Sequence, residues 1–405
     1  MHRRTLLAGL TVAAPAALAL PGTAFAQGNP DGGERDRLQE LLEAVHQAGM
    51  PGLFAEVRAD YRRWGLAAGL ADVDSGRPVQ PWFRHRVGSI TKTFVATVVL
   101  QLAGEGRLGL DDPITRYLPE YATGAITIRM LLNHTSGVFN YTNALLQTPD
   151  DVINVGKRVY RPQELIAIAL SQPPTGPPGS PFSYSNTGYI FLGLLIERLT
   201  GRRYADEVQR RILRPLGLHS SYFPGGFPRI HGPHSEAYVP WIDGNLRDFS
   251  VYNMTWAWAA GELISTPQDL NRFYRALLGG RLLNARLLRE MQTTNPFDPT
   301  VPDAGGYGLG LYWLGLPGGE RAWGHDGGTV GHVTLSVHGS RSLTMAENMA
   351  FYSVPGEPHP IDIARVEFVL AALGVNAPAA TTATTPVRLH WTPDVKAARP
   401  FGTLS

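Results

Sequence analysis

Cysteine is absent from the 405 residues of this chain. Disulfides, thiol catalysis, iron–sulfur clusters and cysteine-based zinc sites are therefore excluded, and packing alone must hold the fold together. Charge is also scarce, because charged residues make up 17% of the chain, the net charge is +2, and the lysines and arginines are scattered. Such a composition gives no reason to expect a nucleic acid or an acidic partner. Hydrophobic residues make up 43%, which is typical of a globular protein with a sizeable core.

Several catalytic and cofactor motifs are missing as well. The sequence contains no Gly-x-Ser-x-Gly elbow, no His-Glu-x-x-His metal motif, no phosphate loop and no dinucleotide fingerprint. The segment closest to the elbow, residues 133–137 (Asn-His-Thr-Ser-Gly), lacks the first glycine. His231 and His234 lie in a stretch rich in Gly and Pro without an obvious carboxylate partner, which favours a loop over a metal site. We therefore expect no metal and no cofactor.

Residues 1–26 have the pattern of a secretory signal peptide. Arg3 and Arg4 precede an apolar run over residues 6–19, and a small-residue cleavage site ends the stretch, which predicts a mature chain that begins at Gln27. The paired arginines indicate twin-arginine export, and standard export is an equal alternative because the surrounding consensus is incomplete. We expect a secreted, extracellular monomer without a membrane anchor, since no later segment is long and apolar enough to span a bilayer.

The most informative stretch is a Ser-x-x-Lys sequence, Ser89 to Lys92. It opens an apolar helix with Phe94, Val98 and Leu102 at helical spacing. Side chains three residues apart share one face of a helix, so the Lys92 ammonium can reach the Ser89 hydroxyl. A serine is a poor nucleophile until a base takes its proton, and a desolvated lysine can be that base. The alternative, a helix cap followed by a surface lysine, is common for so short a motif.

A second candidate is the segment Tyr184-Ser185-Asn186, which lies between the Pro-rich residues 173–181 and a predicted helix. The Tyr184 hydroxyl can pass protons if a cation lowers its pKa from about 10, and Lys92 would be that cation. Asn186 can donate its amide hydrogens to a substrate carbonyl. The alternative is a turn tyrosine followed by an asparagine helix cap.

The third candidate, residues 323–328 (Trp-Gly-His-Asp-Gly-Gly), is predicted to lie at the end of a strand. Its two glycines let the backbone approach a ligand closely and leave N–H groups free for an oxyanion. His325 would serve as a cation or a hydrogen-bond donor beside the nucleophile. A tight hairpin turn is the alternative, and it accounts for the glycines but not for the histidine.

In this order, Ser-x-x-Lys, Tyr-x-Asn and His-x-Gly resemble the motifs of the serine β-lactamase and penicillin-binding protein superfamily. The tyrosine in the second motif resembles the branch that holds class C β-lactamases and the Streptomyces-type D-alanyl-D-alanine carboxypeptidase. The segments that also resemble this carboxypeptidase are residues 87–92, 128–137, 184–187 and 306–311. The resemblance extends over about residues 35–373.

The resemblance implies a role for each of these positions. Ser89 would form the acyl-enzyme, while Lys92 and Tyr184 would share the proton transfers. These two groups titrate as a coupled pair, so the base in acylation stays open between them. The N–H groups of Ser89 and Gly328 would form the oxyanion hole. The positions that would bind substrate are Asn186, His325, Asp326, Gly327, Gly328 and Thr329.

Helix and strand patterns gather near the two ends of the chain. Helices are predicted over residues 35–48 and 361–373, and strands over residues 53–61, 64–73, 306–316, 321–323, 331–339 and 343–352. Residues 106–215 show almost no strand alternation and are predicted to be an inserted helical unit. The resemblance implies the same arrangement, in which the sheet combines both chain ends.

We therefore expect an α+β fold of the β-lactamase/transpeptidase type, with an antiparallel sheet flanked by helices and an inserted all-α lobe. Residues 27–375 would form a single catalytic module. Its α/β lobe would comprise about residues 35–105 and 250–373, and its helical lobe about residues 106–249. An Ala-, Thr- and Pro-rich tail would follow over residues 376–405.

Two departures from the carboxypeptidase pattern bear on the substrate. Relatives that cleave D-alanyl-D-alanine have His-Thr-Gly where this chain has His325-Asp326-Gly327. An arginine that pairs with the substrate carboxylate in the resembling enzyme is replaced by Tyr312 and Trp313. An ionised Asp326 facing the cleft would repel a carboxylate by about 1 to 4 kcal/mol. The equally weighted alternative is that Asp326 points away into a turn.

The leading hypothesis is a secreted serine D-alanyl-D-alanine carboxypeptidase-like hydrolase that acts on peptidoglycan stem peptides or related D-peptides and binds β-lactams covalently. An esterase, D-amino-acid amidase or peptidase with the same machinery would explain the loss of the carboxylate site. A class C-like β-lactamase is the third possibility, and it needs a well-placed deacylating water. The non-enzymatic alternative is an inactive protein that binds cell-wall peptides, and three intact motifs argue against it.

Overall fold

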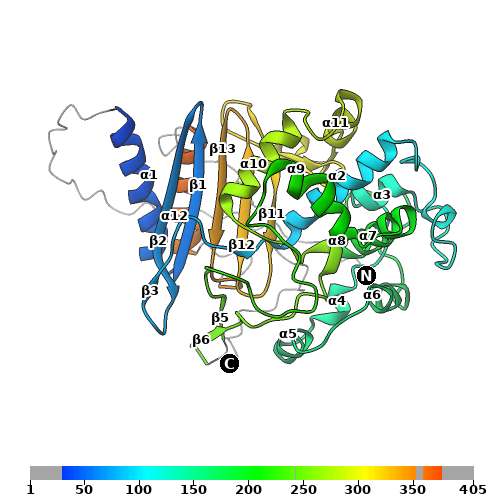
Figure 1. The fold of residues 1–405 in the computed structure, drawn as a ribbon, viewed down its shortest axis with the longest axis horizontal. Helices are drawn as coiled ribbons and strands as arrows, with labels where there is room; N and C mark the ends of the chain where they lie inside the picture. The colour runs from blue at the N-terminus through cyan, green and yellow to red at the C-terminus, as the bar shows by residue number, and fades with distance from the viewer. Residues whose placement is uncertain (1–29, 242, 353–358, 376–405) are drawn as a thin grey trace, which may run out of the picture.

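An antiparallel sheet at the centre of the fold joins the two ends of the described chain (Figure 1). The computed structural model describes residues 30–241, 243–352 and 359–375, so the predicted signal peptide and the predicted tail over residues 376–405 lie outside the described residues. Within these ranges the sheet has nine strands in the order β3-β2-β1-β13-β12-β11-β10-β9-β8. The strands are β1 Gly52–Ala59, β2 Arg62–Asp72, β3 Arg77–Pro78, β8 Asn295–Pro296, β9 Gly305–Tyr307, β10 Tyr312–Gly315, β11 Arg321–Gly328, β12 Val333–His338 and β13 Arg341–Glu347.

The pairing of β1 with β13 joins the strands from the start of the chain to those from its C-terminal part. Leu53 lies opposite Glu347 and Ala59 opposite Arg341, so a strand from the start of the chain is in register with one from near its end. The chain between β3 and β8 lies outside this sheet. The predicted α+β class with an antiparallel sheet flanked by helices is confirmed.

Helices from opposite ends of the chain, α1 (Pro30–Gln47) and α12 (Pro360–Ala372), cover one face of the sheet (Figure 1). Leu343 and Met345 of β13 point to this face and join a buried cluster with both helices. Thr344 lies between them and points to the other face, where it donates a hydrogen bond to Asn271 of α10 (Pro267–Leu278) at 2.9 Å. Because alternate residues of a strand point to opposite faces of the sheet, β13 contacts α1 and α12 on one face and α10 on the other.

Helix α2 (Thr91–Gly104) is buried along most of its length between the sheet and the helical region. A helix that is apolar all round is expected to be a core helix. Phe94 of α2 stacks on Phe273 of α10, with ring centroids 3.7 Å apart. The other helices are α3 Ile128–Leu132, α4 Thr142–Leu145, α5 Pro149–Val155, α6 Pro162–Leu170, α7 Asn186–Thr200, α8 Tyr204–Val208, α9 Arg214–Leu216 and α11 Ala285–Gln292.

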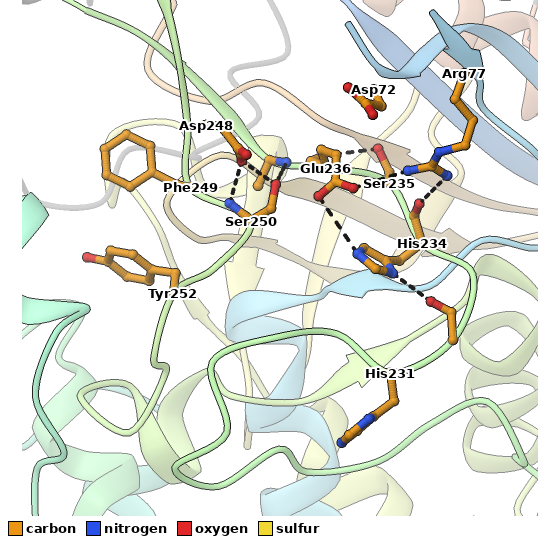
Figure 2. A network of polar contacts seen from close by, with 12 residues as sticks. Asp72, Arg77, His231, His234, Ser235, Glu236, Asp248, Phe249, Ser250 and Tyr252 are labelled. Atoms are coloured by element: carbon orange, nitrogen blue, oxygen red, sulfur yellow. Dashed lines mark hydrogen bonds and ion pairs between the residues drawn. The ribbon is translucent and has the colours of Figure 1, made fainter. Parts of the chain in front are cut away.

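Polar contacts fix the irregular segment of residues 220–250 to the edge of the sheet (Figure 2). Arg77 of β3 reaches this segment, where it pairs with Glu236 at 3.1 Å and donates to the His234 carbonyl at 2.9 Å. His234 lies 3.8 Å from Glu236, whereas His231 points away from this network (Figure 2). Two short ribbons complete the strands: β4 His85–Arg86 with β7 Ile264–Ser265, and β5 Tyr238–Pro240 with β6 Leu246–Asp248.

Several strands differ from their predicted bounds, and the strand predicted over residues 343–352 already ends at Glu347 in β13. The strand predicted over residues 321–323 continues to Gly328 in β11 and pairs with β12 from Trp323 to Gly328, so the hairpin-turn alternative for the third motif is wrong. The single strand predicted over residues 306–316 is divided into β9 and β10, because Gly310, with a φ of +76°, turns the chain.

None of the helices in the described ranges has the length and apolar character needed to cross a bilayer.

Candidate active site

Ser89 lies in a 3₁₀ turn, Gly88–Ile90, directly before α2. Its Oγ is hydrogen-bonded to Lys92 Nζ at 2.8 Å. The same Oγ accepts a hydrogen bond from the Tyr184 hydroxyl, also at 2.8 Å. The three side chains predicted to carry the chemistry are therefore in direct contact, although Ser89 and Tyr184 are 95 residues apart in the chain.

Lys92 is fully buried beneath Ser89 at the start of α2. Its Nζ also donates to the Ala260 carbonyl at 2.8 Å and lies 4.9 Å from the centre of the Tyr184 ring. Burial lowers the pKa of Lys92 well below its usual range, and the Asp326 carboxylate opposes this shift. The site thus favours a neutral amine, which can accept a proton from Ser89.

Tyr184 shows the opposite shift. Burial raises the pKa of its hydroxyl well above the usual value, while the hydrogen bond to Ser89 opposes this change. The prediction that a lysine cation lowers the pKa of Tyr184 is wrong, because burial disfavours the phenolate and also favours the neutral form of Lys92. Ser89 Oγ therefore contacts an amine that burial shifts toward its neutral, proton-accepting form and a phenol that keeps the proton it can donate.

Two glycines bring β11 against the Ser89 turn. A Cβ on Gly327 would lie 2.0 Å from Val87 O and 2.7 Å from Ser89 N. A Cβ on Gly88, whose φ is +53°, would lie 2.7 Å from Gly328 N. Only glycine permits so close an approach of two backbones. Ser89 and Gly328 both line the cavity described below, as the predicted oxyanion hole requires.

Asn186 begins α7 and lines the same cavity beside Tyr184. Its side-chain Nδ2 donates to Thr142 Oγ1 at 3.3 Å. Ser185 occupies the N-cap position of α7, so the alternative of an asparagine helix cap is wrong. Asn186 therefore presents its amide at the cavity wall.

His325 lies in β11 at the cavity wall, and both of its ring nitrogens are engaged. A carbonyl oxygen can only accept, so Nδ1 carries the proton and donates it to Asp326 O. Nε2 accepts a hydrogen bond from the Tyr307 hydroxyl at 2.8 Å. Burial lowers the pKa of His325 to about 3, and Lys92 contributes to the decrease. His325 is a neutral ring here. Of the two roles predicted for it, a cation or a hydrogen-bond donor beside the nucleophile, the cation is therefore wrong, and its one N–H donates to Asp326 O.

Asp326 pairs with Leu335 inside the β11–β12 ladder, so the alternative that places it in a turn is wrong. It lines the cavity together with Tyr312. Burial raises the pKa of Asp326 to about 6, against the opposing effects of the nearby Tyr312 hydroxyl and of Lys92. No lysine or arginine is among the described residues that line the cavity. No cation in this lining would therefore offset the repulsion between the Asp326 carboxylate and a substrate carboxylate.

The cavity has a volume of about 350 Å³ and largely aromatic and aliphatic walls. Ser89 lies between a wall from the sheet side and a wall from the helical side. Besides Tyr184, the large apolar and aromatic residues of the two walls are Tyr141, Leu146, Phe182, Met254, Trp256, Phe297, Tyr307, Tyr312 and Leu314. With the exception of Tyr312, they were not predicted as site residues, because they come from separate loops and strands and share no local spacing. The only sequence signal was that Tyr307 belongs to a segment of the family resemblance.

A sequence profile of the Beta-lactamase family matches residues 35–343. The chain belongs to the beta-lactamase family. Among solved structures, the D-stereospecific amidohydrolase from Streptomyces sp. is 39% identical, and the alignment covers 78% of this chain and 94% of that one, with a TM-score of 0.72. The D-amino acid amidase from Ochrobactrum anthropi SV3 is 25% identical over 84% of this chain and 99% of its own, also with a TM-score of 0.72.

Two sequence relatives of this beta-lactamase-family chain are penicillin-binding proteins. Penicillin-binding protein 4 from Amycolatopsis lactamdurans is 27% identical over 375 residues, which are 80% of this chain and 94% of that protein. A penicillin-binding protein of Bacillus subtilis (strain 168) is 26% identical over 287 residues, and the match spans 66% of this chain and 61% of that protein. The chain is accordingly a serine hydrolase of the β-lactamase and penicillin-binding protein type.

Most of the site residues expected from the family resemblance meet in this cavity. Those that line it are Ser89, Tyr184, Asn186, His325, Asp326 and Gly328, with Lys92 beneath them. Two predicted substrate-binding residues do not line it. Gly327 packs against the Ser89 turn. Thr329 is buried beyond the end of β11, where its N–H donates to His332 O at 2.8 Å.

Proposed function

We propose that this chain hydrolyses amides and peptides of D-amino acids with apolar or aromatic side chains, and that its substrates lack a carboxylate next to the scissile bond. The observation that carries the proposal is the Asp326 carboxyl beside Tyr312 in a cavity with aromatic walls. At pH 7 and above, an ionised Asp326 would repel a substrate carboxylate by about 1 to 4 kcal/mol. Similarity to a D-stereospecific amidohydrolase and to a D-amino acid amidase supports the D-amide class.

In the proposed reaction, Ser89 Oγ attacks the amide carbonyl while its proton passes to the neutral Lys92 amine. The oxyanion of the tetrahedral intermediate accepts hydrogen bonds from the N–H groups of Ser89 and Gly328. Tyr184 donates its proton to the leaving nitrogen and regains one from the Lys92 ammonium. The C–N bond then breaks, the amine departs, and an ester on Ser89 remains. Water attacks this ester and Lys92 takes a proton from the water. The Lys92 ammonium then returns this proton to Ser89 Oγ as the bond between Oγ and the acyl carbon breaks, which releases the D-amino acid or peptide acid and restores the neutral amine.

The D-alanyl-D-alanine carboxypeptidase activity expected from the sequence stays a second prediction, together with covalent binding of β-lactams. Its support is the similarity to two penicillin-binding proteins. A D-alanine methyl group fills little of an aromatic cavity, and Asp326 opposes a terminal carboxylate, so we rank this activity below amide hydrolysis. Action on peptidoglycan stem peptides, export through the predicted signal peptide and a monomeric state belong to the same set of predictions.

Three substrates separate the two activities: D-phenylalanine amide, its L enantiomer, and a peptide ending in D-alanyl-D-alanine. We expect kcat/KM for D-phenylalanine amide to exceed that for the peptide by about tenfold or more, given the repulsion by Asp326. We also expect the D amide to be preferred over the L amide. Asp326→Thr should raise turnover of the peptide relative to the D amide. A wild type that prefers the peptide, or a ratio that Asp326→Thr leaves unchanged, contradicts the proposal.

Labelled benzylpenicillin distinguishes the remaining activities of the family. The mass of the adduct is followed over time, since a long-lived adduct at Ser89 supports a penicillin-binding enzyme and rapid turnover supports a β-lactamase. The absence of any adduct, together with rapid hydrolysis of a p-nitrophenyl ester but not of D amides, would favour an esterase. A Ser89→Ala variant that keeps full activity on any of these substrates would exclude the proposed mechanism.

A further inference from the structure

His134 lies between α3 and α4, in the segment of residues 133–137 that the proposed reaction does not use. It is 1% exposed, and its φ of +60° is a left-handed backbone conformation that few residues other than glycine adopt. Residues persist in this conformation only where the surrounding structure determines it, and they cluster at functional sites. The contacts of His134 give a physical reason for its conformation.

His134 holds the segment that carries Tyr184 at two points. Its carbonyl oxygen accepts a hydrogen bond from Ser183 N at 2.8 Å, and its ring Nδ1 accepts one from Ser185 N at 3.2 Å. Ser183 and Ser185 are the neighbours of Tyr184 in the chain, so both bonds restrain the backbone that carries this tyrosine. Because Nδ1 is an acceptor, the neutral ring carries its proton on Nε2.

The imidazole of His134 also contacts the Tyr184 ring directly. Their centroids are 4.3 Å apart, with an angle of 37° between the ring planes. The same imidazole lies 4.6 Å from the ring of Tyr307, whose hydroxyl donates to His325. His134 therefore contacts both the tyrosine that donates to Ser89 and the tyrosine that holds His325 in β11.

The surroundings of His134 exclude a positive charge. Burial lowers the pKa of His134 well below its usual value, and Lys92 lowers it further. The groups that face the ring are Lys92, Phe182, Tyr184, Tyr189, Tyr307 and His325. None of these groups is a carboxylate that could pair with an imidazolium. Protonation would also remove the acceptor for Ser185 N–H.

We infer that His134 is a positioning residue, which holds the Tyr184 hydroxyl on Ser89 through the Ser185 hydrogen bond and the contact between the two rings. The inference rests on the proposed donation of a proton by Tyr184 to the leaving nitrogen. An amide nitrogen must be protonated in order to leave, whereas p-nitrophenolate leaves without a proton. Loss of His134 should therefore slow amide cleavage selectively, with little effect on substrate binding.

His134→Phe tests this inference because it keeps an aromatic ring and removes the acceptor. The kcat for D-phenylalanine amide and the rate of Ser89 acylation by benzylpenicillin should fall by about 100-fold, with KM for the amide unchanged. Hydrolysis of p-nitrophenyl acetate should change far less. His134→Asn tolerates a positive φ and offers Oδ1 to Ser185 N–H, so it should restore most of the amide rate. Should His134→Phe fail to fold, His134→Gly removes the same acceptor and suits the backbone conformation.

A double-mutant cycle separates positioning from a general loss of stability. In a Tyr184→Phe background, where the proton donor is already missing, His134→Phe should cause no further loss of the amide rate. Additive losses, or equal losses for the amide and the ester, would overturn the inference. The matched control is His338→Phe, since His338 is another buried histidine, stacked on Tyr274 in the sheet and outside the cavity. An amide-selective loss in this control would also overturn it.

Benzylpenicillin keeps this test separate from the D-amide proposal. A wild type that is acylated by penicillin but does not cleave D amides contradicts the proposed function, and its acylation rate still measures the effect of His134. A wild type in which neither an amide nor penicillin acylates Ser89 overturns both.

Discussion

Lys92 Nζ lies 2.8 Å from Ser89 Oγ in a buried environment that favours the uncharged amine. Its other hydrogen bond goes to a carbonyl oxygen, Ala260 O, which adds no charge. The charge that opposes the effect of burial is the carboxylate of Asp326. The protonation state of Lys92 therefore depends on burial and on one acidic residue, and mutation can change the two separately.

Lys92→Met should remove most of the activity while the fold persists. Methionine fills a similar volume with a flexible apolar chain but has no amine to accept the Ser89 proton. We expect kcat/KM for D-phenylalanine amide to fall by about 10²- to 10⁴-fold, the usual contribution of general base catalysis. Steady-state kinetics and a thermal melt check the two parts of the prediction. A folded variant within tenfold of wild-type activity would show that Lys92 is not the base.

Asp326→Asn should move the acidic limb of the pH–activity profile to lower pH. The Asp326 carboxylate raises the pKa of Lys92, so its removal lowers that pKa and keeps the amine neutral in more acidic solution. We expect a displacement of roughly one pH unit or less in kcat/KM. The profile should be measured with an uncharged ester, so that the substrate itself does not titrate. An unchanged limb, or one displaced to higher pH, would contradict the assigned link between Asp326 and Lys92.

The same substitution should stabilise the folded protein above pH 6. Burial raises the pKa of Asp326 from 3.8 to about 6, so the folded state binds this proton more tightly than the unfolded state does. The resulting stabilisation is complete below pH 3.8 and is lost as the pH rises through 6. Above that pH the ionised carboxylate costs at most about 3 kcal/mol, which asparagine avoids. The gain in melting temperature of Asp326→Asn over wild type should therefore be larger at pH 8 than at pH 5, and the reverse order would contradict it.

Local sequence spacing was sufficient to predict the core of the site. The three-residue step from Ser89 to Lys92 places both side chains on one face whether the backbone is α or 3₁₀, so the contact forms although Ser89 precedes the helix. The resemblance added Tyr184, which is too distant in the chain for any periodicity to connect it to Ser89. The sheet was predictable for a similar reason, since two-residue alternation is a local property of each strand.

Burial decided the features that the sequence did not predict. The charge states of His325 and Tyr184 depend on how much protein surrounds them, which is set by residues far away in the chain. The direction of the Asp326 side chain depends on the length of β11 and on its pairing with β12. The sequence predicted no role for His134, because its left-handed backbone and its bond to Ser185 exist only in the folded chain.

Gly327→Ala should impair the oxyanion hole more than it impairs folding. The new Cβ would meet Val87 O at 2.0 Å and Ser89 N at 2.7 Å, so β11 must move away from the Ser89 turn. Separation of the two N–H donors should lower kcat by about 10²- to 10³-fold, as for the loss of one oxyanion donor. Gly33→Ala, on the exposed face of α1, is the matched control because a Cβ there meets no atom within 4 Å. Kinetics of both variants check the prediction, and a Gly327→Ala enzyme with wild-type kcat would contradict this position for the oxyanion hole.

Phe297→Ala should reduce the preference for aromatic substrates without slowing the chemical step. Phe297 lines the sheet side of the cavity and contacts Phe182 edge to face, with centroids 5.3 Å apart. Burial of an aromatic side chain against such a wall contributes about 1.5 to 3 kcal/mol, so KM for D-phenylalanine amide should rise by about tenfold or more while kcat is kept. D-alanine amide has only a methyl group to bury and should be affected much less. The control is Phe227→Ala, which removes an exposed aromatic ring outside the cavity and should leave KM for both amides unchanged. An equal rise in KM for both amides in Phe297→Ala would contradict the assignment of this wall to the substrate side chain.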